Sequence, residues 1–375
     1  MKITSVKTHV LGDTMLVSIH TDSSLIGLGE SACWAYPGAA AAVIDRFATY
    51  LVGETTNRIE HHWHRMARMA PFRGAAISGA LSAVDIALWD LRGRELGVPT
   101  HALLGGPYRD RVRLHRIIQG TDTESLGRAA ADAAAAGYTA VKFDPLGPAA
   151  IDATTSILAA TARERAAAVQ DATNGRVDLI IEIHRALTPH QVPAVLDALR
   201  PLAPLFVEDP IQIDTIDIQA RLTSHGVPLG LGERWQSPYE VREALQVGGP
   251  FVVRSDVALA GGISAAKKIS AIAEAHHAQV SWHNWAGPVT AAATLTVDTA
   301  ISNTLTHEHA EDGLAAFGAA AHSGWRIDDG YAIASTMPGI GIDLDLERLP
   351  ERVDVLDRPL HEIPRRRDGS VAFAV

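Results

Sequence analysis

Residues 109–325 alternate short β-rich runs with longer Ala-rich stretches of helical character, and this rhythm constrains the fold more than any other feature. Strands separated by helices form parallel sheets, because each crossover helix returns the chain to the same edge of the sheet. Eight strands of this kind close a (β/α)8-type (TIM-like) barrel. The eight runs are "VRLHRII", "TAVKF", "DLIIEI", "PLFVE", "PLGLG", "FVVRS", "AQVSW" and "TLTHE". The sequence therefore predicts an α/β protein built on such a barrel.

The chain on either side of this region predicts a second, α+β capping domain. Residues 1–108 begin with the strand-like runs "ITSVKTHVL" and "MLVSIHTD" and continue into the helical stretch "AISGALSAVDIALWDLRGREL". Residues 326–375 carry turn signals in place of another strand–helix unit. We expect an N-terminal capping domain over 1–108, a catalytic barrel over 109–325, and a C-terminal segment over 326–375 that packs back on the cap. Within the long helix, Asp90 is expected to form a structural ion pair.

Composition and charge exclude several classes of protein. The net charge of −10 argues against a general nucleic-acid-binding protein. The N-terminus lacks the apolar core of an export signal, and no run reaches the ~18 apolar residues of a membrane span. The single cysteine, Cys33, cannot form an intramolecular disulfide and suits a reducing compartment. We expect a cytoplasmic homo-oligomer that binds a small molecule and binds neither nucleic acid nor membrane.

Polar residues close most of the predicted barrel strands at regular intervals. From Glu182 onward, consecutive members of this set are 23 to 27 residues apart, which is about the length of one strand–helix unit. Each step therefore reaches the same end of the next strand, and in a barrel the C-terminal strand ends surround one shared cavity where active sites are built. The set consists of Lys142, Glu182, Glu208, Glu233, Asp256, His283 and Glu308.

Three of these residues, Glu182, Glu208 and Glu233, end consecutive strands and predict a metal site. Taken singly, each glutamate could equally be a helix N-cap or an ion-pair partner at its loop. Three carboxylates buried together would repel one another strongly, and a hard divalent cation removes that repulsion. Mg²⁺ prefers such oxygen ligands and keeps coordination sites open for a substrate. We expect Mg²⁺ at these three residues, with Mn²⁺ as an acceptable substitute.

Asp256 and His283 end the next two strands and predict a general base. A carboxylate beside an imidazole fixes its tautomer and raises its basicity. A lone histidine is more often structural, and the chain has 17 of them, so the position of His283 carries the prediction.

Further polar residues near the strand ends are expected to face the cavity. His184 lies two residues after Glu182, and side chains two apart on a strand point the same way. Both are therefore expected to face the cavity, the alternative being that His184 is only a loop residue over the barrel mouth. Lys142 and Asp144 in "VKFDP" have the same spacing.

Taken together, these motifs resemble the enolase superfamily, specifically its mandelate racemase branch and the galactonate- and mannonate-type dehydratases of acid sugars within it. The resemblance covers essentially the whole chain, and the order of its motifs makes it specific. The motifs are "GLGES", "FRGAAISGALSAVDIALWDLRGRELGVPTHALLGG", "GYTAVKFDP", "IEIHRALTP", "LFVEDP", "GER", "DVALAGGI" and "WHNWAGP".

The resemblance implies Mg²⁺ at the three glutamates and a base formed by His283 and Asp256. It also implies that Glu308 donates a hydrogen bond to the substrate carboxylate, and that Lys142 helps to hold the ene-diolate formed when the C2 proton leaves. The "E-x-H" pairing resembles the "D-x-H" of the acid-sugar dehydratases and implies that His184 protonates the departing hydroxyl. Racemases of this branch carry Lys-x-Lys on the second barrel strand, where this chain has Asp144 as the second residue.

We therefore expect a lyase that dehydrates an aldonate or aldarate to a 2-keto-3-deoxy acid. A cycloisomerase or epimerase of a sugar acid or its lactone on the same scaffold is the alternative. A metal-dependent hydrolase is less favoured, because its metal usually has several histidine ligands, whereas the candidate ligands here are all carboxylates. The sequence does not identify the sugar acid, and it leaves the roles of Asp144 and Arg73 open.

Overall fold

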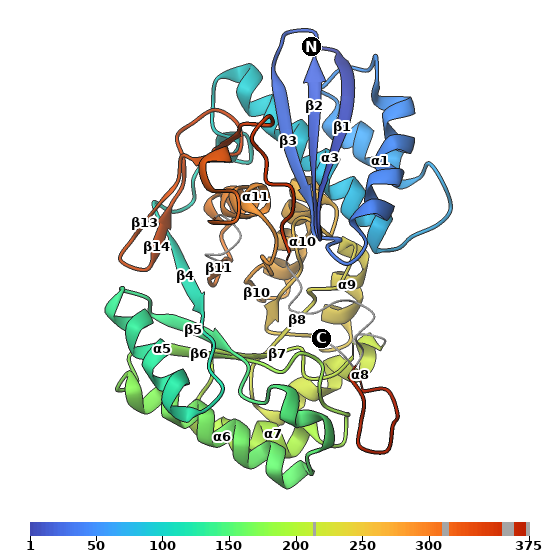
Figure 1. Cartoon of the computed structure of the whole chain (residues 1–375). Coiled ribbons are helices and arrows are strands. Elements are labelled where there is room, and N and C mark those ends of the chain that lie inside the picture. Colours follow the sequence, from blue (N-terminus) through green and yellow to red (C-terminus); the bar gives the residue numbers. More distant parts are fainter. Residues whose placement is uncertain (213–214, 310–314, 355–363, 373–375) are drawn as a thin grey trace.

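The N-terminal part of the chain forms an antiparallel sheet with helices packed on one face (Figure 1). The computed structural model describes residues 1–212, 215–309, 315–354 and 364–372. The sheet has the order β1-β2-β3. Its elements and those that follow are β1 (Ile3–Leu11), β2 (Thr14–Thr21), β3 (Ile26–Ser31), α1 (Pro37–Leu51), α2 (Ile59–Ala67), α3 (Ala75–Leu96) and α4 (Thr100–Leu103).

Two glycines allow β3 to lie directly on α3, the long helix predicted from the sequence. A Cβ atom on Gly29 would be 1.8 Å from the carbonyl oxygen of Ala83, and one on Gly27 would be 2.3 Å from that of Ala87. Only glycine permits so close an approach of two backbones. The contact fixes the direction in which the chain leaves β3, toward the barrel.

All eight predicted strands are present and follow one another round a closed ring (Figure 1). Adjacent strands from β4 to β10 pair in parallel, and β11 pairs in parallel with β4. A single bridge between Val280 and Thr304 joins β10 to the residues before β11 and completes the ring. The strands are β4 (Val112–Ile117), β5 (Ala140–Phe143), β6 (Asp178–Glu182), β7 (Phe206–Glu208), β8 (Leu229–Leu231), β9 (Val252–Val253), β10 (Gln279–Val280) and β11 (His307–His309).

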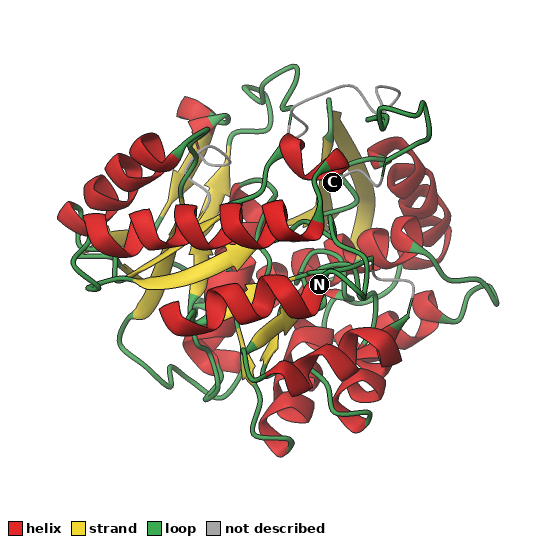
Figure 2. Cartoon of the chain, turned by 90° about the horizontal axis from the view of Figure 1, so that it is seen from below, coloured by secondary structure: helices red, strands yellow, loops and turns green. Residues whose placement is uncertain are grey.

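Helices cover the outside of this ring, as Figure 2 shows from below. They are α5 (Thr123–Ala135), α6 (Thr155–Ala172), α7 (Val192–Leu199), α8 (Ile216–Arg221), α9 (Pro238–Gln246), α10 (Gly262–Ala275) and α11 (Pro288–Ala300). The apolar faces of these helices and of the strands share one buried core. The expected (β/α)8-type barrel with an N-terminal cap is confirmed. No helix in the described part of the chain is both long and apolar enough to cross a membrane.

The C-terminal segment contacts the cap only in part. Its strands are β13 (Arg326–Asp328), β14 (Tyr331–Ile333) and β15 (Ile342–Leu344), and β15 pairs with β12 (Ala321–Ser323), which precedes the segment. Val353 exchanges backbone hydrogen bonds with Leu11 and Asp13 of the cap, as expected. The hairpin β13–β14, however, pairs with β4 of the barrel, and Arg366 donates to the carbonyl of Ile151. Residues 355–363 and 373–375 of the predicted segment lie outside the described residues.

Asp90 joins three separate parts of the fold. It is fully buried in α3, and its Oδ2 accepts hydrogen bonds from Arg94 Nε at 2.8 Å and from the Leu28 N–H in β3 at 3.0 Å. Its Oδ1 accepts from the Ile340 N–H of the C-terminal segment at 2.9 Å. The predicted structural ion pair of Asp90 is confirmed.

We predict that Asp90→Asn destabilises the protein by about 3–5 kcal/mol, because it breaks a buried pair and turns an acceptor into a donor that faces a backbone N–H. Asp343→Asn is the matched control, since Asp343 pairs with the same Arg94 but its side chain is 53% exposed. It should cost only about 0–1 kcal/mol. Thermal unfolding followed by circular dichroism compares the two, and equal midpoints would contradict the assignment.

Candidate metal and acid–base site

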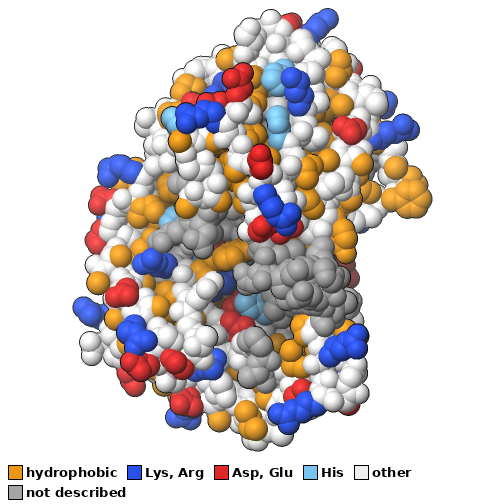
Figure 3. Space-filling view, in the orientation of Figure 1, with side chains coloured by type: hydrophobic (Ala, Val, Ile, Leu, Met, Phe, Trp, Pro, Cys, Tyr) orange, Lys and Arg blue, Asp and Glu red, His pale blue; other side chains and the backbone are white. Residues whose placement is uncertain are grey.

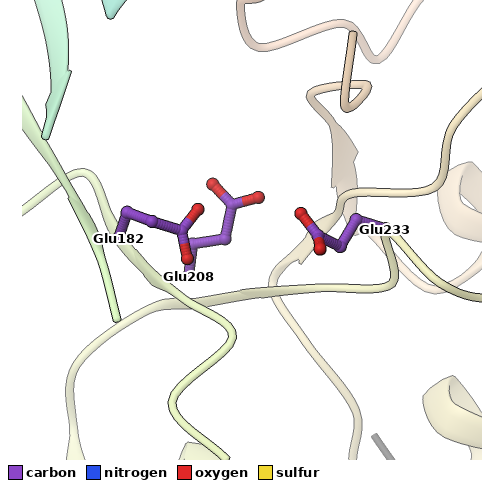
Figure 4. Close-up of side chains that lie close together, drawn as sticks. All are labelled: Glu182, Glu208 and Glu233. Atoms are coloured by element: carbon purple, nitrogen blue, oxygen red, sulfur yellow. The ribbon is translucent and has the colours of Figure 1, made fainter. Parts of the chain in front are cut away.

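The three predicted metal ligands meet at the C-terminal ends of β6, β7 and β8. Glu182 and Glu208 are the last residues of β6 and β7 and lie opposite each other in the sheet, and Glu233 follows β8 by two residues. All three are buried, and each offers one carboxylate oxygen such that the three lie within 4.8 Å of one another. Figure 4 shows Glu233 facing the other two across a common space. Strand register, which the sequence spacing predicted, brings these side chains together.

In each glutamate the protein holds one oxygen and leaves the other to face the cluster. The Oε1 atoms accept from the His184 N–H (on Glu182), from Arg254 (on Glu208) and from Arg185 (on Glu233). The Oε2 atoms of Glu182 and Glu208 are buried without a hydrogen-bond partner among the described residues. Two carboxylate oxygens without hydrogen bonds, together with a carboxylate oxygen of Glu233, are the kind of ligands that a hard divalent cation prefers. The residues present therefore fit such an ion.

Charge around the cluster is only partly balanced. Lys142 Nζ lies 3.1 Å from Oε2 of both Glu182 and Glu208, as an ion pair without hydrogen-bond geometry. Burial, together with the charge of Glu182, raises the pKa of Glu208 to about 8 despite the nearby Arg254. Although burial opposes its ionisation, His184 and Lys142 lower the pKa of Glu182 to about 2. One carboxyl of the cluster therefore holds a proton near neutral pH unless a further cation neutralises the group.

His283 and Asp256 form the predicted pair. Their backbones are joined by a parallel bridge, and His283 Nδ1 is 2.6 Å from Asp256 Oδ2. The backbone N–H of Ala258 donates to the other carboxylate oxygen of Asp256 and so fixes its orientation. With Nδ1 occupied, Nε2 is the free imidazole nitrogen, 3.6 Å from Glu233 Oε2. Although burial opposes protonation, Glu233 and Asp256 raise the pKa of His283.

His184 is beside the cluster, but the geometry expected for it is wrong. The strand ends at Glu182, so His184 does not share a strand face with it; His184 has φ +49° and lies in a left-handed turn. Its Nδ1 is 2.9 Å from Asp144 Oδ2, and Oδ1 of Asp144 accepts from the N–H groups of Leu146 and Gly147. Although burial opposes protonation, Glu182 and Asp144 raise the pKa of His184 to about 9.

Glu308 lies at the centre of a buried polar network. Its Oε2 accepts from Lys142 Nζ at 2.7 Å and from Arg254, and its Oε1 accepts from the Asn284 N–H at 2.9 Å. Although burial opposes its charge, Arg254 and Lys142 hold the pKa of Glu308 well below its usual value. The predicted donation of a hydrogen bond by Glu308 therefore requires it to take up a proton. Burial lowers the pKa of its neighbour His115 to about 3, so this imidazole is neutral.

Four buried residues of the site were not identified from the sequence: Arg185, Asp209, Arg254 and His115. Arg254 could have been identified from the sequence, because it lies two residues before Asp256 and residues two apart on a strand point to the same side. Asp209 follows Glu208 directly and pairs with Arg185, whose own place depends on the left-handed turn after β6. Arg73, whose role was open, is exposed and lines a surface depression formed by residues 67–73.

The comparisons with known proteins identify the family of the chain. The family model for the mandelate racemase/muconate lactonizing enzyme N-terminal domain matches residues 1–105, and the model described as enolase C-terminal domain-like matches residues 125–349. A D-galactonate dehydratase of Variovorax paradoxus is 33% identical over 99% of this chain and 100% of that protein. One of Verminephrobacter eiseniae is 32% identical with the same coverage.

Solved structures show the same fold over the whole chain. An enolase of Agrobacterium radiobacter, a candidate galactarate dehydratase with bound sodium and L-malate, has a TM-score of 0.92 and 26% identity, and the match covers 100% of both chains. A mandelate racemase/muconate lactonizing enzyme of Jannaschia has a TM-score of 0.86 and 29% identity, covering 92% of this chain and 96% of that one. This chain therefore belongs to the mandelate racemase/muconate lactonizing enzyme family of the enolase superfamily.

Proposed function

We propose that this protein is a Mg²⁺-dependent dehydratase of a sugar acid, an aldonate or aldarate, and that its product is a 2-keto-3-deoxy acid. The observation that carries the proposal is the presence of two His–Asp pairs on opposite sides of the glutamate cluster. His283 follows β10 and His184 follows β6, which are four positions apart in a ring of eight strands. The full-length relatives named D-galactonate dehydratase support the same reaction class.

His283 has the geometry of the base. Asp256 holds the proton on Nδ1, so Nε2 presents a lone pair and removes the C2 proton of the substrate. The electrons of the broken C2–H bond form the C1–C2 double bond of an ene-diolate. Lys142, the buried cation shared by Glu182, Glu208 and Glu308, lies where it balances the added negative charge.

His184 has the geometry of the acid. Asp144 holds its Nδ1, so its Nε2 proton is the one available to the leaving 3-hydroxyl. The C3–O bond breaks as the ene-diolate electrons form the C2–C3 double bond, water leaves, and the enol tautomerises to the 2-keto-3-deoxy acid. A raised pKa keeps His184 protonated at neutral pH, which suits this step.

Glu182, Glu208 and Glu233 would hold the cation through their inward-facing oxygens. A bound Mg²⁺ supplies Lewis acidity toward the carboxylate oxygens of a substrate. A C2 epimerase is the second candidate, because an imidazole on each side of the site allows a proton to leave from one face and return on the other. A homo-oligomeric state and a cytoplasmic location remain predictions from the sequence.

Removal of the divalent ion should abolish activity, and Mg²⁺ or Mn²⁺ should restore it. We expect Glu208→Gln to lose most of its Mn²⁺ binding while keeping its fold, because the amide removes one negative ligand with little change in volume. Mn²⁺ binding is measured by the electron paramagnetic resonance (EPR) signal of the free ion, and activity after exhaustive EDTA treatment. Full turnover without metal would contradict the site assignment.

The decisive test separates C2 proton removal from water loss. We predict that His184→Asn blocks 2-keto acid formation but still exchanges the C2 proton with solvent, because Asp256–His283 remains intact. His283→Asn should reduce both by about 10²–10⁴-fold. A library of aldonic and aldaric acids is first screened with wild-type enzyme, and the variants are then followed in D₂O by NMR and by a colorimetric 2-keto acid assay.

Two outcomes of that test would overturn the assignments. Undiminished dehydration by His184→Asn would mean that His184 is not the acid. If the wild-type enzyme exchanges or epimerises C2 but releases water from no sugar acid, the protein is an epimerase instead of a dehydratase.

A further inference from the structure

One segment of the cap, residues 30–34, contacts the barrel through alternate residues. The carboxylate of Glu30 accepts from the N–H groups of Gly287 and Thr290, at 2.7 and 2.8 Å, where α11 begins after β10. The N–H of Ala32 donates to the carbonyl of Ala258, in the loop after β9, at 3.0 Å. The ring of Trp34 then lies 4.8 Å from the guanidinium carbon of Arg234, in the loop after β8.

These contacts carry the segment across three successive strand ends of the barrel. Only Glu30 lies in β3, which ends at Ser31, whereas Ala32 and Trp34 lie in the connection that follows the strand. One contact of each residue falls close to a proposed site residue: Gly287, bonded by Glu30, is four residues after His283; Ala258, bonded by Ala32, is two after Asp256; and Arg234, beside Trp34, directly follows Glu233. The cap therefore touches the loops that hold the base and the third metal ligand.

Arg234, which Trp34 contacts, forms an ion pair with the proposed metal ligand Glu233. Nη2 of Arg234 is 3.1 Å from Glu233 Oε1, the oxygen that also pairs with Arg185. Arg185 is buried and fixed by Asp209 as well, whereas the Arg234 side chain is 22% exposed. An arginine that reaches solvent loses its orientation easily, and a stacked aromatic ring restricts it.

The indole of Trp34 has no other evident polar role. Its Nε1 is buried and has no hydrogen-bond partner among the described residues. A buried indole N–H without a partner is costly, so packing must hold the ring in this place. Figure 3 shows charged and histidine side chains in a hollow below the cap.

We propose that Trp34 is a positioning residue for the metal site: it fixes Arg234, which in turn orients Glu233 so that its second oxygen faces the cluster. The inference rests on the proposed metal site. Its consequence is that the cap contributes to ion affinity, because the ligand geometry of the barrel is complete only when the cap segment is in place.

The test measures Mn²⁺ affinity by EPR, independently of turnover. Trp34→Leu should weaken binding by about 10- to 100-fold, the usual effect of losing a partner of a metal ligand, because Arg234, the partner of Glu233, would lose its orientation. Trp34→Phe keeps an aromatic face over Arg234 and should recover most of the affinity. Tyr36→Leu, two residues after Trp34 and with Tyr36 65% exposed, is the control and should bind like wild type.

A double-mutant cycle then asks whether Trp34 acts through Arg234. Arg234→Gln should weaken Mn²⁺ binding by a similar factor, and adding Trp34→Leu to it should cause no further loss. Additive losses would overturn the proposal, as would a Trp34→Leu variant that is folded by circular dichroism and binds like wild type. If Trp34→Leu does not fold, the Arg234→Gln variant tests the proposal alone. Mn²⁺ binding by that variant equal to wild type would then overturn the proposal. Absence of Mn²⁺ binding in the wild-type protein would instead refute the metal site itself.

Discussion

The mutual repulsion of three buried carboxylates is the constraint to which the rest of the structure responds. Glu182, Glu208 and Glu233 meet at adjacent strand ends with their oxygens within 4.8 Å, out of contact with water. A buried charge costs free energy unless it is paired, and replacing such clusters with apolar residues is often stabilising. Their presence is therefore better explained by function than by stability.

The protein compensates this repulsion mainly at the outer oxygens, and Lys142 approaches the inner ones. Arg185, Arg254 and the N–H of His184 each take one oxygen of one glutamate, which holds the three carboxylates in a fixed orientation. Lys142 is the sole cation among the described residues that lies within 4 Å of both Glu182 and Glu208. Hydrogen-bonding the outer oxygens while leaving the inner ones without hydrogen bonds preorganises a binding site at the expense of stability. The same arrangement explains why the pKa of Glu208 is raised while those of Glu182 and Glu233 are lowered.

The sequence was sufficient for every feature that depends on strand register. The eight strands and the placing of Glu182, Glu208, Asp256 and His283 follow from a repeat of about 25 residues, because barrel geometry converts that spacing into proximity. It was insufficient where the backbone leaves the strand. His184 reaches Asp144 through a left-handed turn, and no local pattern in "EIHRALTP" distinguishes that turn from continued strand.

Contacts between segments far apart in the sequence could not be predicted either. Trp34 and Arg234 are 200 residues apart, and neither residue type is unusual in its own surroundings. The C-terminal segment shows the same limit, since β14 pairs with β4 while Val353 and Ile340 bond to the cap, and a single sequence does not reveal which part takes which partner. Register within a repeat is local information, whereas the choice of partner depends on the whole fold.

The two His–Asp pairs show how one motif acquires two roles from its position in the ring. Each carboxylate holds Nδ1 of its histidine and leaves Nε2 free, so the local chemistry is the same. The proposed roles differ because His283 and His184 follow strands on opposite sides of the barrel. If one imidazole served both steps, the proton taken from C2 would have to be carried to the 3-hydroxyl before water could leave. With two imidazoles, the departing hydroxyl can receive a proton from a second nitrogen, and the intermediate need not wait for that transfer.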